Sequence, residues 1–152
     1  MPIQLLAGMT ADDLSFVVQQ NVICYIDGSD STKIEMYRGD SKNMLCALWD
    51  KQDNPLSIAG ATIWFTIKDK TKLFEDDDTS SVLQLISTDS DEILLYDTLN
   101  GIFKIFIKPE HTHLLPYGNY EYDIQINLND EVTTIKRGLF KIMSEVTRDY
   151  EV

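Results

Sequence analysis

The residues with the clearest capacity for chemistry are the two histidines, His111 and His113, which follow Glu110. In an extended strand, residues two apart face the same way, so the two imidazoles could share a metal ion; in a helical turn they would diverge. The sequence around them offers no further ligand at the spacing of a metal site. We therefore expect two surface histidines in a connecting turn and no bound metal.

Acidic residues are the other source of chemistry, since the chain has 25 of them. Four stand together from Glu75 to Asp78, where a calcium loop is the alternative to an exposed loop of repelling charge. The run lacks the glycine and the spaced terminal glutamate of an EF-hand, so the exposed loop is favoured. A catalytic carboxylate pair could lie among the others, but linear sequence cannot place two of them across a cleft.

Motifs that define enzyme classes are absent from the sequence. It has no glycine-rich phosphate loop, no nucleophile elbow, no Cys-x-x-Cys pair and no zinc-protease helix motif. We therefore predict a protein that is not an enzyme and that uses no cofactor.

Two further motifs have simpler structural explanations. Cys24 and Cys46 each lie in an apolar, strand-like run, so we expect both to be buried and reduced, although neighbouring strands would permit a disulfide. The tripeptide 38–40, Arg-Gly-Asp, matches an integrin-binding motif. It is too short to be specific, and a break between two strands accounts for it.

Aromatic side chains could form a platform for carbohydrate, and the candidates are Trp49, Trp64, Tyr117, Tyr120 and Tyr122. The last two share one face of a predicted strand with two isoleucines, so core packing is favoured for them.

Composition limits the class of protein. The chain has 152 residues, of which 43% are hydrophobic and 25% charged, as expected of one globular domain. Its formal net charge of −12 would repel phosphate groups, so we expect neither nucleic acid nor an anionic membrane surface as a partner. No run of 18 apolar residues and no basic N-terminal segment occurs, so neither a membrane span nor a signal peptide is predicted.

The stretch from Gly101 to Leu128 organises the predicted fold. Residues 102–108 alternate with period two, both faces are fairly apolar, and one face carries Lys104 and Lys108. Pro109 ends this strand, residues 110–115 have room for one helical turn, and a second strand follows. In that strand apolar side chains alternate with polar ones, which predicts a half-buried strand.

The other segments are predicted to form partner strands separated by turns. We predict strands over 22–25, 33–38, 43–50 and 61–69, a hairpin of 82–86 with 92–96, and a final pair turned at 129–130 with a bulge or corner at Gly138. About eight short strands with little helix predict an all-β fold, an immunoglobulin-like antiparallel β-sandwich.

Residues 1–30 differ from the rest and are assigned to an N-terminal arm and first strand, with a short helix plausible from Thr10 to Gln20. Residues 31–149 form the predicted sandwich and 150–152 a tail. The arm either packs on its own domain or docks on a neighbouring subunit. Its apolar residues Ile3, Leu5 and Leu6 are our candidates for partner binding.

Several segments, in this order, resemble an immunoglobulin-like module of tailed-bacteriophage virion proteins, and the N-terminal domain of phage baseplate upper proteins is a near relative. The resemblance covers Met36 to Asp149. It is carried by Gly39-Asp40, Asp53-Asn54-Pro55, Ala59-Gly60-Ala61-Thr62, the run from Leu115 through Tyr120 to Ile124, and Gly138-Leu139-Phe140-Lys141-Ile142 followed by Val146-Thr147.

The resemblance implies a non-enzymatic structural protein of the virion, assembled in the bacterial host cytoplasm. Its partners would be other phage structural proteins and further copies of itself in a symmetric assembly, at the baseplate, tail, neck or capsid surface. The chain departs from the pattern in its first 30 residues and in lacking the long region that follows this module in baseplate upper proteins. The alternative is a module that binds a host-surface glycan or receptor.

Deleting residues 1–9 tests the predicted arm. If Ile3, Leu5 and Leu6 dock on a neighbour, the deletion abolishes assembly into particles while the melting temperature of the isolated chain stays unchanged. A large fall in melting temperature would instead show that the arm belongs to the core.

Overall fold

The structure is a computed structural model that describes residues 22–69 and 81–147. The described chain is built from strands, with one short 3-10 turn and one α-helical turn. The elements are β1 (Val22–Ile26), β2 (Ile34–Tyr37), β3 (Lys42–Asp50), β4 (Thr62–Asp69), β5 (Ser81–Ile86), β6 (Ile93–Asp97), η2 (Thr98–Asn100), β7 (Ile102–Ile107), α2 (Pro109–Thr112), β8 (Gly118–Leu128) and β9 (Glu131–Met143).

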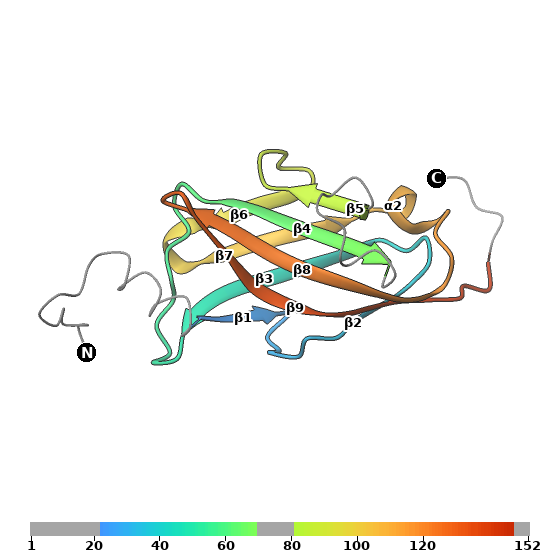
Figure 1. The fold of residues 1–152 in the computed structure, drawn as a ribbon, viewed down its shortest axis with the longest axis horizontal. Helices are drawn as coiled ribbons and strands as arrows, with labels where there is room; N and C mark the ends of the chain where they lie inside the picture. Colours follow the sequence, from blue (N-terminus) through green and yellow to red (C-terminus); the bar gives the residue numbers. More distant parts are fainter. Residues whose placement is uncertain (1–21, 70–80, 148–152) are drawn as a thin grey trace, which may run out of the picture.

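The strands form two sheets that pack face to face (Figure 1). Sheet A has the order β1-β3-β7-β6 and sheet B the order β2-β9-β8-β4-β5. All neighbouring strands are antiparallel except β2, which runs parallel to β9. Strands β1-β3-β7-β6 opposite β9-β8-β4 reproduce the seven-stranded immunoglobulin arrangement, with β5 added beside β4. The fold is an all-β, immunoglobulin-like sandwich, as the sequence predicted.

The core lies between the sheets and follows the period-two pattern of the strands. Phe65 on β4 contacts the Tyr122 ring at 5.6 Å and the Phe140 ring at 6.2 Å between centroids, and all three side chains are buried. In antibody domains a disulfide between the two sheets fills this region, against an aromatic side chain on the strand equivalent to β4. Here three aromatic rings from sheet B, in tilted and edge-to-face contact, fill part of this region.

A tyrosine fixes the start of β8. The hydroxyl of Tyr120 donates to the carbonyl oxygen of Pro116 at 2.6 Å. This is the tyrosine corner of immunoglobulin-like domains, in which a ring in the core anchors the loop before its strand. The sequence predicted that Tyr120 is buried, as it is. It did not predict the hydrogen bond of the hydroxyl, because that bond depends on the geometry of the loop.

One chain segment crosses from sheet A to sheet B between β1 and β2. Asp27 and Gly28, with φ of 50° and 80°, form a tight turn closed by mutual backbone hydrogen bonds between Ile26 and Ser29. The following residues are held by sheet B. Lys136 Nζ donates to the carbonyl oxygens of Cys24 and Asp30 at 2.6 and 3.1 Å, and the Tyr122 hydroxyl donates to that of Thr32 at 2.7 Å.

Gly138 is needed for this same crossing. The sequence predicted a bulge or corner there, but Gly138 pairs in register with Tyr122, and the irregularity of the β8–β9 ladder lies near Ile135 instead. A Cβ atom on Gly138 would lie 2.2 Å from the Thr32 carbonyl oxygen. The glycine therefore permits the close approach of another backbone segment.

The predicted hairpin of residues 82–86 with 92–96 is wrong. β5 pairs with β4 in sheet B and β6 pairs with β7 in sheet A, so the chain changes sheets between them. The connecting residues bond to one another, with the amides of Glu92 and Ile93 both donating to the carbonyl oxygen of Asp89. β5 pairs with β4, which is longer than β6, and a polar turn of this length is compatible with either connection.

Gly138→Ala tests the docking of the crossing. The added methyl would meet Thr32 backbone atoms at 2.2 and 2.9 Å, so we expect a loss of about 1–3 kcal/mol in the free energy of unfolding. Urea unfolding measures it. Val132→Ala on the same strand, at a side chain 57% exposed, is the control and should change little. Equal stability of Gly138→Ala and the wild type would contradict the close approach.

Candidate functional site

The two histidines are the metal-ligand candidates of the sequence, and the structure places both at one helical turn. Both lie in or beside the α2 turn, as predicted, and His111 Nδ1 accepts the backbone amide of Lys108 at 2.9 Å. Desolvation lowers the pKa of His111, because burial disfavours the charged ring. Within residues 22–69 and 81–147, no three His, Cys, Asp or Glu side chains come together as metal ligands.

Arg38 of the Arg-Gly-Asp tripeptide is partly buried and bound to other residues of the domain. Its guanidinium binds both carboxylate oxygens of Glu145, at 2.9 and 2.8 Å, and lies 4.3 Å from the centre of the Tyr117 ring. The amide of Gly39 donates to the buried hydroxyl of Thr112 at 2.8 Å. These contacts join the β2–β3 turn, the α2 region and the end of β9 at one end of the sandwich (Figure 1). Arg38 therefore has a structural role there.

Cys24 and Cys46 are free thiols buried on the inner face of adjacent strands, as the sequence predicted. A hydrogen bond to Cys24 and burial together raise the pKa of Cys46 well above its usual range. The same hydrogen bond lowers the pKa of Cys24, and because both side chains are buried between the sheets, the pair packs as core.

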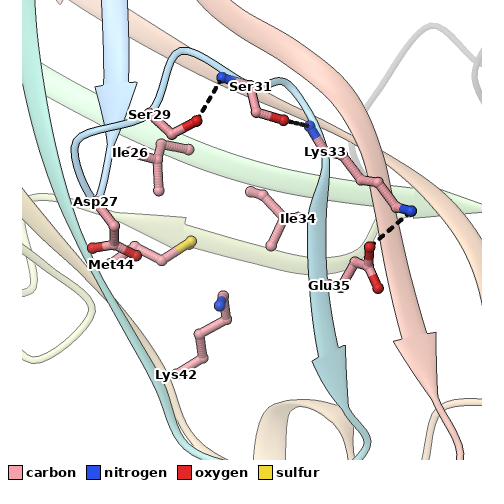
Figure 2. A pocket seen from close by; sticks show the side chains of 9 residues that line it. All are labelled: Ile26, Asp27, Ser29, Ser31, Lys33, Ile34, Glu35, Lys42 and Met44. Atoms are coloured by element: carbon pink, nitrogen blue, oxygen red, sulfur yellow. Dashed lines mark hydrogen bonds and ion pairs between the residues drawn. The ribbon is translucent and has the colours of Figure 1, made fainter.

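A small cleft of about 130 Å³ lies beside the crossing from β1 to β2 (Figure 2). Ile34 and Met44 lie at its base, and charged side chains surround it, among them Lys33 and Glu35, which form an ion pair at 2.7 Å. Both partners of that ion pair are largely exposed. The cleft is open, and its charged groups are either paired or solvated. We therefore interpret it as a gap between the edges of the two sheets.

The outer face of sheet A is the most unusual surface of the described domain. Side chains that alternate with the buried ones point outward from β1, β3, β7 and β6. We call this set the sheet A face. Its apolar members are Ile23, Tyr25, Leu45, Ala47, Trp49, Leu94, Tyr96, Ile102 and Phe106, and its polar members are Asn43, Asp97 and Lys104.

Charges on the sheet A face are few and balanced. Lys104 lies in the middle row, directly between Leu45 and Leu94, and its ammonium rests 4.0 Å from the centre of the Tyr96 ring. Asp97 lies at the end of β6, where its carboxylate accepts from the Asn100 side chain at 2.9 Å. One cation and one anion leave the face uncharged in a chain whose net charge is −12.

Sheet B has a mixed outer face, on which the apolar side chains Tyr37, Trp64, Ile86 and Val132 lie among polar rows. Its cross-strand rows pair Lys68 with Glu121, and Thr66 with Asp123 and then Arg137. Such polar rows are typical of a sheet face that meets water. An apolar outer face is the exception in soluble sandwiches and marks a contact surface. The sheet A face has two charged residues, Asp97 and Lys104, among nine apolar ones, so it is the candidate site.

One signal for this face is present in the sequence. Residues 102–108 are fairly apolar on both faces, whereas a strand between the core and solvent needs only one apolar face. The other contributors, such as Leu45 and Tyr96, lie in separate strands, and only the sheet order brings them together.

The aromatic candidates fall into different places. Tyr120 and Tyr122 are core residues, Tyr117 lies under Arg38, Trp64 belongs to the outer face of sheet B, and Trp49 belongs to the sheet A face. They do not form one platform.

Four predicted features lie outside the described residues. These are the partner-binding candidates Ile3, Leu5 and Leu6, the short helix from Thr10 to Gln20, the acidic run from Glu75 to Asp78, and the tail of residues 150–152. Within the ranges that are described, no helix has the length and apolar character needed to cross a membrane.

Comparison with known proteins finds no matching family model and no matching curated protein. Among solved structures, CopC from Methylosinus trichosporium OB3b is similar with 12% identity over 82% of this chain and 97% of that chain, and a TM-score of 0.43. The Lin-41 filamin domain has 16% identity over 79% and 91%, with a TM-score of 0.40. Murine CRIg has 9% identity over 82% and 98%, with a TM-score of 0.38. At this level the likenesses carry no information about function.

Desolvation of His111 predicts a pH dependence of stability. The pKa of the folded-state ring is lowered from 6.5, so the unfolded chain binds the extra proton more readily, and stability falls as pH drops below about 6.5. The ring is partly solvated, so we expect a loss of less than about 1 kcal/mol between pH 7.5 and 5.5. Unfolding curves of His111→Ala should lack this component while those of His113→Ala keep it. The same slope in all three proteins would contradict the assignment.

Proposed function

We propose that this chain is a non-enzymatic structural protein of a bacteriophage virion, which assembles by protein–protein contacts at the baseplate, tail, neck or capsid surface. The observation that carries the proposal is the sheet A face. It places nine apolar side chains on the outside of a domain whose core is already filled. Such a surface gains free energy only when another surface covers it.

The chemistry of the described residues supports binding over catalysis. The side chains that could react are used in packing or in structural hydrogen bonds: the two thiols are buried, His111 caps a turn, and Arg38 is bound to Glu145. A domain of this kind works by holding partners in fixed positions.

The phage assignment rests on the resemblance of ordered segments, and several of them have defined structural roles. Gly39 has φ of 80° in the β2–β3 turn, Asp53 has φ of 64° after β3, Tyr120 forms the tyrosine corner, and Gly138 admits the crossing backbone. These are positions at which geometry restricts the residue type, so they are the positions a family pattern would retain.

A glycan-binding module is the second candidate function. It is supported by three aromatic side chains on the sheet A face, Tyr25, Trp49 and Tyr96. Sugar sites combine an aromatic surface with several hydrogen-bonding groups around it. The sheet A face provides Asn43, Asp97 and Lys104, of which two are occupied by Asn100 and Tyr96. The balance of apolar over polar groups favours a protein partner.

Immunogold electron microscopy of purified phage particles tests the proposed function. An antibody raised against this chain should label one defined location on intact particles, and peptide mass spectrometry of the same particles should detect the chain in stoichiometric amount. Particles that contain no such chain, with the protein free in the infected-cell lysate, would overturn the virion assignment. Binding to a glycan array that is lost in Trp49→Ala would then favour the second candidate.

A further inference from the structure

We propose that the free edge of β2 binds an extended peptide segment of another protein, which joins sheet B as an additional strand and places one apolar side chain in the cleft beside β2. The inference adds a second contact surface to the binding function proposed above, and it does not depend on the virion assignment. It is argued from the backbone groups of the edge strands, the volume of the cleft and the charge of its lining.

The other edge strands, β1, β5 and β6, have outward backbone groups that are already bonded. In β1 the carbonyl oxygen of Cys24 accepts from Lys136. The outward amides of Ile86 in β5 and Ile93 in β6 both donate to acceptors in the turn that connects these two strands. Register shifts also interrupt the ladders of β5 and β6. Bonded groups and irregular ladders both oppose the addition of a further strand.

β2 keeps free backbone groups along its outer side. It runs parallel to β9, and the amide of Arg38 donates to the carbonyl oxygen of Met143, so the even-numbered residues of β2 bond to β9. The amides of Glu35 and Tyr37 and the carbonyl oxygens of Lys33 and Glu35 therefore point away from the sheet. None of these four groups has a hydrogen-bond partner among residues 22–69 and 81–147. An extended peptide beside β2 can pair with all four.

The cleft of about 130 Å³ lies beside this edge, between β2 and the start of β3 (Figure 2). Ile34 and Met44, which are 4% and 1% exposed, form its apolar base. The volume is similar to the roughly 150 Å³ that takes up a group the size of benzene. It is well below the roughly 300–1,000 Å³ of pockets that hold whole small ligands. The cleft is therefore suited to one apolar side chain of the added strand, at the position next to Ile34.

Charge in the lining specifies a second position of the peptide. Lys33 and Glu35 neutralise each other, and the Asp27 carboxylate accepts the amide of Leu45 at 2.9 Å. Lys42 is the remaining charged group of the lining, and it forms no ion pair with the part of the chain that the structure describes (Figure 2). Side chains two apart share one face of a strand. The fitting segment therefore has an acidic residue two positions from its apolar residue.

Titration of the isotope-labelled full chain with a capped peptide of about seven residues tests the inference by NMR. The probe peptide has a valine and a glutamate two positions apart among threonines, and a matched peptide has lysine in place of that glutamate. We expect saturable shifts at the amides of residues 33–37 and 42–44, and binding of the lysine peptide weaker by about fivefold or more. N-methylation of the threonine between valine and glutamate removes a backbone donor and should also weaken binding.

A charge reversal in the protein gives a readout that misfolding cannot imitate. Lys42→Glu should bind the lysine peptide more tightly than the glutamate peptide. Lys51→Glu makes the same charge change at an exposed residue of the turn after β3, so it is the matched control and should keep the preference for glutamate. Glu35→Pro removes one edge amide and should abolish binding, since edge strands tolerate proline where the amide faces solvent. Near-ultraviolet circular dichroism checks the fold of each variant.

Three results would overturn the inference. These are the absence of saturable shifts at peptide concentrations up to about 2 mM, shifts that map to the sheet A face, and an unchanged preference for glutamate in Lys42→Glu.

The outcomes also separate this inference from the virion function. Peptide binding by a chain that is absent from particles would retain the edge site and remove the virion role. Labelled particles whose chain binds no peptide would retain the role and remove the edge site.

Discussion

The domain depends on how sheet B holds the backbone between β1 and β2. This segment leaves sheet A at Ile26 and enters sheet B at Ile34, and donors from the opposite sheet satisfy two of its carbonyl oxygens. Lys136, which is only 8% exposed, donates to the carbonyl oxygen of Asp30 and also to that of Cys24 in β1, and the Tyr122 hydroxyl donates to that of Thr32. Such oriented carbonyl dipoles stabilise a buried cation.

The same crossing creates the surface to which we assign the function. By keeping β1 beside β3, it adds Ile23 and Tyr25 to the sheet A face and makes that face four strands wide. The opposite end of the sandwich is fixed separately, by Arg38 with Glu145 and Tyr117. The core aromatics Phe65, Tyr122 and Phe140 all belong to sheet B, and their rings pack against one another on its inner face. A sandwich with a largely apolar outer face on one sheet is suited to oriented protein contacts.

Sequence patterns predicted what depends on neighbouring residues. The alternation of Tyr122 and Ile124 with polar residues, the turn at 129–130 and the break at Pro109 all appear where expected. The partner of each strand was less predictable. The hairpin of 82–86 with 92–96 failed because pairing with β4 and β7 is a long-range choice, and Gly138 was misassigned because its constraint comes from Thr32, more than a hundred residues earlier. The sheet A face was not predicted for the same reason.

Hydroxyl-radical footprinting of intact particles, compared with the free chain at low concentration, tests most directly whether the sheet A face is the contact surface. Oxidation is followed by mass spectrometry at Trp49 and Tyr96 on sheet A, and at Trp64 and Tyr37 on sheet B. We predict that assembly protects Trp49 and Tyr96 several-fold and leaves Trp64 and Tyr37 as reactive as in the free chain. Protection of the sheet B residues with no change at Trp49 and Tyr96 would contradict the assignment of the contact to sheet A.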